Sequence, residues 1–224
     1  MNLQNLRKAG KKLCMDALKK IAYYQDRRDE VPNQELAREL AQTRNDADIH
    51  AIAENLWNKE PAIQSDCLKV LYELGYLAPD LISEYVEEFL RLLKQRNNRL
   101  VWGGMIALST IANLQADKIF PHVEEIIKTM KSGSVITNDA GIKTLTGVAA
   151  QKEAYRTRLL PYLLEQLACA RAVDAPRYAE VILAAISPTE KADFIRILEK
   201  WIGLASGARL ARLKKVRKQA GNIS

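Results

Sequence analysis

Aromatic residues and glycine are scarce in this chain of 224 residues. Aromatics make up 6% of it and glycines number 10. Because strands favour aromatic and β-branched residues, this composition is more typical of helices than of sheets. No window approaches the ~18 uninterrupted apolar residues that a membrane-spanning helix needs. The sequence therefore predicts a helical protein with no membrane span.

Cysteine is also rare. Cys14, Cys67 and Cys169 lie far apart, and an odd, scattered set is not a disulfide framework. Residues 1–20 mix Lys and Arg through the apolar positions, unlike a signal peptide. Both observations predict a cytoplasmic protein in a reducing compartment.

The sequence contains no recognisable catalytic or metal-binding motif. His50 and His122 have no cysteine or acid at ligand spacing, which argues against a zinc site. There is no G-x-S-x-G segment, and the turn Ser132-Gly133-Ser134 lacks the lysine of a phosphate loop. We therefore expect no catalytic residues, no metal and no cofactor.

The chain carries a net charge of +7, which favours acidic partners such as nucleic acid or an anionic protein surface. The charge is concentrated near the C-terminus, where residues 204–224 contain no acid. Two interpretations of this segment stay open: a capping helix that keeps the molecule soluble, or an electrostatic anchor for nucleic acid. Its cations are Arg209, Arg212, Lys214, Lys215, Arg217 and Lys218.

Residues 65–187 contain an internal repeat. When the sequence is shifted against itself by 37 residues, four segments come into register and apolar columns appear three residues apart. That spacing places the columns on one face of a helix. A helical pattern that recurs every ~35 to 45 residues is typical of stacked helical hairpins. The columns are Leu68/Met105/Ile142/Ala179, Leu71/Leu108/Leu145/Ile182 and Leu74/Ile111/Val148/Ala185.

We therefore predict an all-α fold, an α-α superhelix that forms a single domain over residues 1–224. Residues 1–45 would cap its N-terminus, 46–203 would form the repeats, and 204–224 would be a basic C-terminal helix or tail. Prolines at 79, 121, 161 and 188 are expected at or near the start of the first helix of a hairpin. The expected helices are 3–25, 33–42, 46–58, 61–76, 80–95, 99–113, 116–130, 135–150, 153–170, 175–186, 188–202 and 206–220.

Two glycines interrupt the second helices of this pattern. Gly104 and Gly141 share a column of the repeat. Glycine inside a helix costs roughly 1 kcal/mol relative to alanine. The most economical interpretation is a small residue where neighbouring helices cross closely, and a ligand-facing backbone is the alternative.

Paired helices, prolines that open first helices and the apolar columns of the second helices resemble HEAT and armadillo-type repeats over residues ~46 to 203. The aspartate usual early in the second helix of such repeats appears as Asp66 and Asp139 but is missing from the other two. The resemblance implies a HEAT-like solenoid that acts as a binding scaffold, and leaves the partner open.

Residues 31–75 show a narrower resemblance to the HEAT-like DNA alkylation repair glycosylases. It rests on Val31-Pro32, residues 35–41, Asn55-Leu56-Trp57 and a helix from Pro61. In that family a tryptophan four residues before an aspartate helps to form the lesion site. Here the residues four places after the three tryptophans are Pro61, Ile106 and Ala205. The resemblance implies a divergent glycosylase, or a DNA-binding relative without the activity, as the alternative to a non-enzymatic scaffold.

Trp102 is the main candidate for a binding residue, because it lies near the start of a second helix, in the layer that lines the concave face of such solenoids. Cations at repeat spacing could follow a phosphate backbone, although Asp139 and Glu180 lie among them and would weaken such a row. The alternative is that Trp102 packs between repeats and that the cations are merely solvated. The candidate binding residues are Arg99, Trp102, Lys143, Arg177, Arg209 and Arg212, and the predicted partner is a protein or a nucleic acid.

Overall fold

The computed structural model describes residues 17–223, and every regular element in this range is helical. The α-helices are α2 (Val31–Thr43), α3 (Asp46–Glu54), α4 (Pro61–Leu77), α5 (Val86–Leu92), α6 (Asn98–Ile111), α7 (Ala116–Ile119), α8 (Val123–Ser132), α9 (Val135–Ala149), α10 (Glu153–Ala168), α11 (Ala175–Ile182), α12 (Lys191–Leu204) and α13 (Gly207–Gly221). Short 3-10 helices are η1 (Ala22–Gln25), η2 (Asn55–Trp57), η3 (Pro79–Tyr85), η4 (Phe120–His122) and η5 (Leu183–Ala185).

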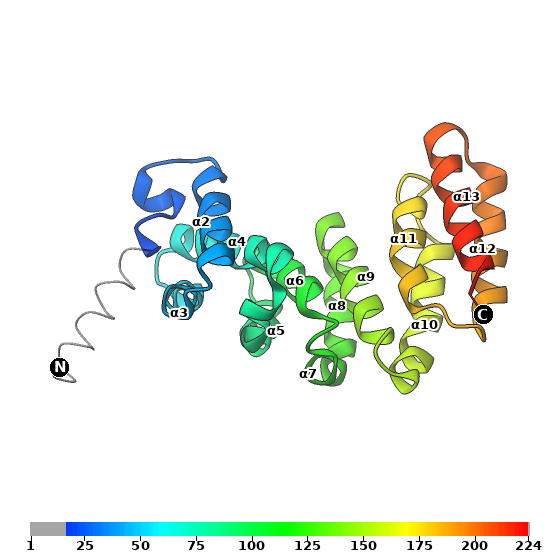
Figure 1. Ribbon diagram of the computed structural model, residues 1–224, viewed down its shortest axis with the longest axis horizontal. Helices are drawn as coiled ribbons and strands as arrows, with labels where there is room; N and C mark the ends of the chain where they lie inside the picture. The colour runs from blue at the N-terminus through cyan, green and yellow to red at the C-terminus, as the bar shows by residue number, and fades with distance from the viewer. Residues whose placement is uncertain (1–16, 224) are drawn as a thin grey trace.

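The helices form hairpins that follow one another along the molecule, from the N-terminal to the C-terminal end of Figure 1. The pairs are α3 with α4, η3-α5 with α6, α7-η4-α8 with α9, α10 with α11, and α12 with α13. Helices α2, α4, α6, α9, α11 and α13 each pack on the next one. We call these six helices the second-helix layer. The predicted all-α superhelix of stacked hairpins is therefore confirmed.

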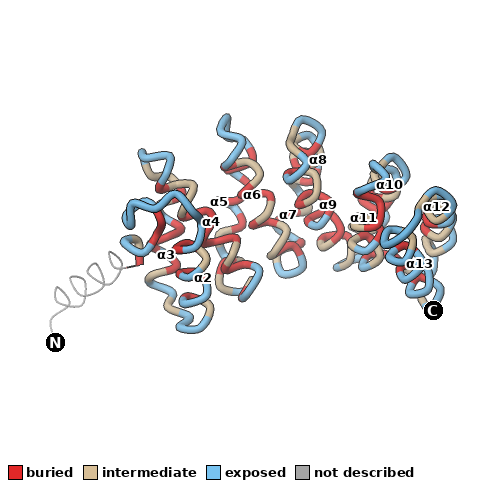
Figure 2. The backbone as a smooth tube through the Cα atoms, turned by 90° about the horizontal axis from the view of Figure 1, so that it is seen from above, coloured by how far each residue is buried: buried red, intermediate tan, exposed pale blue. Residues whose placement is uncertain are grey.

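The repeat columns form the core, as predicted. The column Leu71, Leu108, Leu145 and Ile182 is completely buried, and the other two columns are at most 2% exposed. One hydrophobic cluster extends from Ala17 to Ala220. Figure 2 shows buried segments along the middle of the array and exposed residues at the turns. Successive hairpins thus bury the same stripe against one another, which explains the period of 37 residues.

Gly104 and Gly141 lie where helices approach closely. A methyl group at position 104 would come within 2.9 Å of Cβ of Leu92 and 3.1 Å of the carbonyl oxygen of Phe89. At position 141 it would come within 2.5 Å of Cγ of Met130. Each glycine therefore lets a second helix pack against the first helix of its own hairpin, in agreement with the packing interpretation.

The prediction of one helix over residues 3–25 can be compared with the structure only at residues 17–25, because residues 3–16 lie outside the described range. In residues 17–25 the prediction is wrong. The helix ends after Leu18, and η1 follows. The N–H of Ala22 donates to Oδ1 of Asn33 (2.9 Å), and the N–H of Tyr23 donates to Oδ2 of Asp66 (2.7 Å). Side chains of α2 and α4 thus take the donors that a continuing helix would use, and they fix this segment against the stack.

First helices are less regular than the sequence suggested. The predicted helix 80–95 begins as η3, and 116–130 is divided into α7, η4 and α8 around Pro121. Pro161 lies inside α10 rather than near its start. A proline lacks the backbone donor of a helix interior, which accounts for the break at Pro121. The spacing of apolar residues in the sequence does not distinguish α-helical from 3-10 turns. The 3-10 segments η3 and η4 could therefore not be predicted from that spacing.

Candidate functional site

Trp102 lies on α6 beside a cleft of ≈ 690 Å³. Its indole is partly buried and packs against the ring of Tyr72 on α4, with the ring centroids 6.2 Å apart and the planes at 57°. The cleft lies between these two helices and residues 22–30, which include η1. Trp102 therefore both packs between repeats and lines the cleft.

Lys69 occupies the floor of this cleft in an internal ion-pair cluster. Its Nζ lies 2.7 Å from a carboxylate oxygen of Glu30 and 2.7 Å from one of Glu73, and its side chain is only 11% exposed. The ammonium also lies 4.9 Å from the centroid of the Tyr72 ring. Burial alone would lower the pKa of Lys69, but hydrogen bonds to the two carboxylates outweigh it and raise the pKa. This cation is neutralised within the protein.

Arg99, the first predicted binding residue, is on α6 at the edge of the same cleft. Its guanidinium lies 3.8 Å from Glu30, a long ion pair, and the side chain is 59% exposed. Trp102 and Arg99 thus line one cleft, and the segment before α2 supplies the acid that pairs with Arg99. The repeat could not have predicted Glu30, because that residue lies outside residues 65–187.

Arg177 is held by two carboxylates. One guanidinium nitrogen lies 2.7 Å from both Asp139 on α9 and Asp174, which precedes α11. The side chain of Asp174 is only 8% exposed and also pairs with Arg171. Burial of the phenol, and to a smaller extent the negative charge of the nearby Asp139, raise the pKa of Tyr178 to about 12. Arg177 therefore stabilises the contact between α9 and α11, and its charge is compensated.

Arg212 on α13 forms a bidentate pair with Glu180 on α11, with N to O distances of 2.8 and 2.6 Å. The hydrogen bond from Arg212 lowers the pKa of Glu180. Lys143 and Arg209 are exposed and make no ion pair with a residue in the range 17–223. Of the five cations among the candidate binding residues, these two alone have no ion-pair partner in the described part of the chain.

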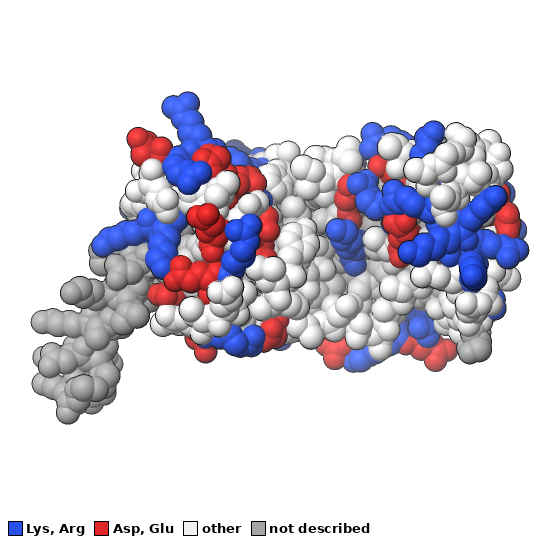
Figure 3. Space-filling view, turned by 45° about the horizontal axis from the view of Figure 1, so that its top comes forward, with Lys and Arg blue, Asp and Glu red and all other residues white. Residues whose placement is uncertain are grey.

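The column that contains Lys69 and Lys143 continues through Ile106 and Glu180. Its members are a neutralised lysine, a half-buried isoleucine, an exposed lysine and a paired glutamate. Figure 3 shows mixed charges over the N-terminal hairpins, a largely uncharged surface in the middle and cations over the C-terminal hairpins. Ile106 is a candidate that we did not single out from the sequence, although it shares the 37-residue column of Lys69 and Lys143.

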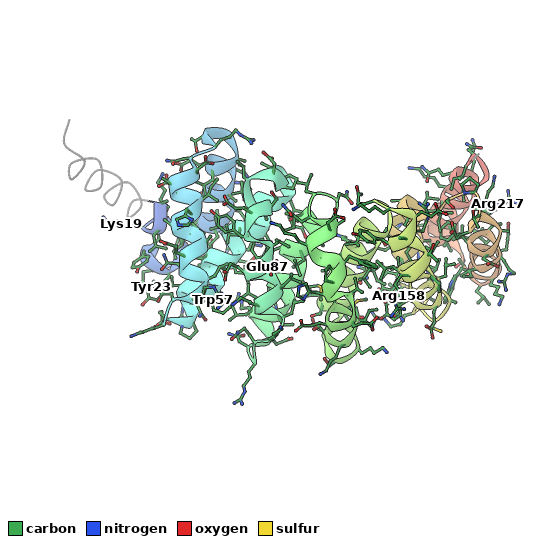
Figure 4. The ribbon with its side chains drawn as sticks, turned by 90° about the horizontal axis from the view of Figure 1, so that it is seen from below. Lys19, Tyr23, Trp57, Glu87, Arg158 and Arg217 are labelled. Atoms are coloured by element: carbon green, nitrogen blue, oxygen red, sulfur yellow. The ribbon has the colours of Figure 1, made fainter. Side chains whose placement is uncertain are left out.

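The C-terminal cations belong to α13, the last helix of the array. Arg217 pairs with Glu199 of α12 at 2.8 Å, and Figure 4 places Arg217 at the end of the molecule opposite to Lys19 and Tyr23. The apolar side of α13 (Leu213, Val216 and Ala220) is buried. Lys214, Lys215 and Lys218 are exposed without an ion pair to any described residue. Helix α13 therefore has one face buried against the array and another that is exposed and cationic.

Within residues 17–223, no three His, Cys, Asp or Glu side chains gather as metal ligands would. His50 lies 3.4 Å from Glu54 in an exposed i,i+4 pair. In the same range, no helix has the length and apolar character needed to cross a membrane. The cysteines also differ in environment: Cys67 is buried, which raises the pKa of its thiol, whereas Cys169 is exposed.

Comparisons with solved structures identify the architecture. A designed armadillo repeat protein in complex with the peptide (KR)4 gives a TM-score of 0.65 at 15% identity, over 99% of this chain and 95% of the other. This chain has an armadillo/HEAT-like α-solenoid fold. A second designed armadillo repeat protein gives 0.63 at 14% identity, over 99% and 95% of the two chains. An engineered protein gives 0.65 at 16%, over 91% and 94%.

No family model matches this armadillo/HEAT-like chain, and no curated protein matches it. At identities of 14 to 16% the structural similarity shows the fold alone. The resemblance of residues 31–75 to alkylation repair glycosylases gains no support from these comparisons. In the structure, Nε1 of Trp57 donates to Glu88 (2.5 Å) and its ring lies under the guanidinium of Arg91, so two residues of α5 hold this tryptophan.

Proposed function

We propose that this protein is a non-enzymatic scaffold that holds a polypeptide partner along its second-helix layer. The observation that carries the proposal is the internal pairing of the cations. Arg99, Arg177 and Arg212 each face a carboxylate of this same chain. A phosphate backbone would have to displace those carboxylates, whereas a polypeptide can use the uncharged surface between them.

The surface around Trp102 has features of a peptide-binding region. Trp102 and Ile106 present partly exposed apolar surface one helical turn apart on α6. Tyr76 on α4 is 53% exposed. Large aromatic side chains with an apolar body and a polar tip are enriched where proteins bind one another. The peptide bound by the designed armadillo repeat protein supports the use of such a fold for this purpose.

A test can use peptides selected from a random displayed library against the immobilised protein. Trp102→Ala should weaken the selected peptides by about tenfold or more, because truncation of a central aromatic typically costs ~2 kcal/mol. Trp201→Ala is the matched control. That tryptophan is also partly buried, but it lies on a first helix, where Nε1 donates to the carbonyl of Leu167. Equal losses for both variants, or no selectable peptide, would contradict the proposal.

Arg177 is a poor choice for the same test. Its removal would leave the nearly buried Asp174 with Arg171 as its remaining ion-pair partner and would destabilise the fold. Lys143→Ala removes an exposed cation without breaking an ion pair of the described chain. The DNA-repair alternative predicts release of 3-methyladenine or 7-methylguanine from alkylated DNA, and release above background would overturn the scaffold proposal. The cytoplasmic location stays a prediction.

A further inference from the structure

Four large apolar side chains are exposed near the junctions between the first and second helices of three successive hairpins. Val135 and Ile136 in the first turn of α9 are 49% and 47% exposed. Val173, just before α11, is 62% exposed, and Leu204, just before the turn into α13, is 79% exposed. We call these four residues the apolar edge. The turns that carry them lie along the upper edge of Figure 1.

The apolar edge is confined to the C-terminal hairpins. Ile136 and Val173 are 37 residues apart and thus occupy equivalent positions. The corresponding junctions of the N-terminal hairpins are polar, with Lys59-Glu60 before α4 and Asn97-Asn98 at the start of α6. A turn between helices is ordinarily polar because it is in contact with water. Exposed apolar residues at three successive helix junctions, in the first turn of α9, in the segment before α11 and at the end of α12, are therefore typical of an interaction surface.

A small cleft opens on this edge between α9 and the segment that joins α10 to α11. Its volume is ≈ 190 Å³, and its walls include Val135, Ala170 and Tyr178, with the amides of Asn138 and Gln166. The exposed Cys169 also lines it. Two amides and the paired Arg171 and Asp174 complete the lining, so the recess has mixed walls and is about large enough for one side chain from a partner.

The electrostatics around the apolar edge favour an acidic partner. The only carboxylate in the cleft wall, Asp174, has a side chain that is 8% exposed and paired with Arg171. Lys131 and Arg209 are exposed nearby in the sequence and make no ion pair with a described residue.

We infer that the apolar edge binds an acidic amphipathic helix of a partner protein. A helix satisfies its own backbone hydrogen bonds, and residues 17–223 offer no strand edge that could pair with an extended chain. Neighbouring helix axes are about 10 Å apart, so α9 to α13 spans about 20 Å, which is the length of ~13 helical residues. The recessed cleft and the absence of Trp, Tyr or Phe among the four exposed residues argue against insertion into a membrane. This surface is separate from the Trp102 cleft and does not depend on the proposed function.

The test uses an 18-residue-long probe, about the span of the edge plus one turn, with leucines on one helical face and glutamates on the other. Its twin carries lysine in place of every glutamate. The glutamate peptide should bind at least tenfold more tightly than its twin. The double variant with Val173→Ser and Ile136→Ser should weaken binding of the glutamate peptide about tenfold. Leu114→Ser is the matched control, because Leu114 is 53% exposed just after the end of α6. It should leave binding unchanged.

The exposed thiol of Cys169 locates the bound peptide. The glutamate peptide should slow alkylation of Cys169, measured by mass spectrometry, and Trp102→Ala should not alter that protection. The inference is overturned if neither peptide binds, if both bind equally, or if binding leaves Cys169 unprotected. It is also overturned if the two serine substitutions weaken binding to phosphatidylserine-containing vesicles but not to the peptide, since the occupant would then be a membrane surface.

Discussion

Gly104 provides the sharpest test of how the hairpins pack. Replacing it with alanine adds ~1 kcal/mol of helix propensity. The added methyl would, however, lie 2.9 Å from Cβ of Leu92 and 3.1 Å from the carbonyl oxygen of Phe89. Neither atom is at the end of a flexible side chain, and overpacking of this kind costs ~1–3 kcal/mol. We therefore expect Gly104→Ala to destabilise the protein by about 1 kcal/mol.

Gly203→Ala is the matched control, because no atom lies within 4 Å of the added methyl. It should stabilise the protein by up to ~1 kcal/mol, so the two variants should differ by ~2 kcal/mol. Gly141→Ala should fall between them, since its methyl meets the flexible side chain of Met130. Urea unfolding followed by circular dichroism gives the midpoints, and equal slopes validate the comparison. Stabilisation by Gly104→Ala comparable to that by Gly203→Ala would refute the close approach of α5 and α6.

Three further predictions concern single side chains. Asp66→Ala should cost ~1–3 kcal/mol, because the N–H of Tyr23 and the buried amide of Asn33 lose their acceptor, and hydrogen exchange of residues 22–25 should accelerate; unchanged exchange would contradict this clamp. Tyr178→Phe should remove one tyrosine ionisation near pH 12 from an absorbance titration; loss of a step near pH 10 instead would contradict its burial. Glu180→Gln should cost under ~1 kcal/mol at pH 7, because the pair is exposed. The pKa of Glu180 is lowered in the folded state, so the difference in unfolding free energy between the variant and the unchanged protein should disappear as the pH falls below about 4. A difference that grows at low pH would contradict this prediction.

The sequence predicted the second helices well because each turn of them places an apolar residue on the same buried stripe. The helix predicted at 135–150 is observed as Val135–Ala149. First helices contribute fewer buried positions, and prolines such as Pro121 interrupt them, so their 3-10 turns were missed. The N-terminal helix was predicted too long because Asn33 and Asp66, distant in sequence, take its backbone donors.

The candidate site could be predicted only in part. Trp102 and Arg99 line one cleft, as their positions on a second helix suggested. The partners of the cations could not be foreseen, because the sequence does not show that Glu30 reaches Arg99 or that Asp174 reaches Arg177. Those carboxylates turn an apparent row of positive charges into a largely neutral surface. The exposure of Val173 and Leu204 was also not predicted. Helical periodicity does not indicate whether an apolar residue between predicted helices is buried or exposed.

The central claim is that the second-helix layer holds a polypeptide and not a phosphate backbone. It is tested most directly by adding duplex DNA to the protein loaded with a selected fluorescent peptide, at about 50 and 200 mM salt. Because Arg99, Arg177 and Arg212 are paired internally, we predict that DNA does not displace the peptide. The affinity for the peptide should change by less than about threefold between the two salt concentrations. Displacement by DNA, with a loss of ~10³ or more in DNA affinity between the two salt concentrations, would contradict the account.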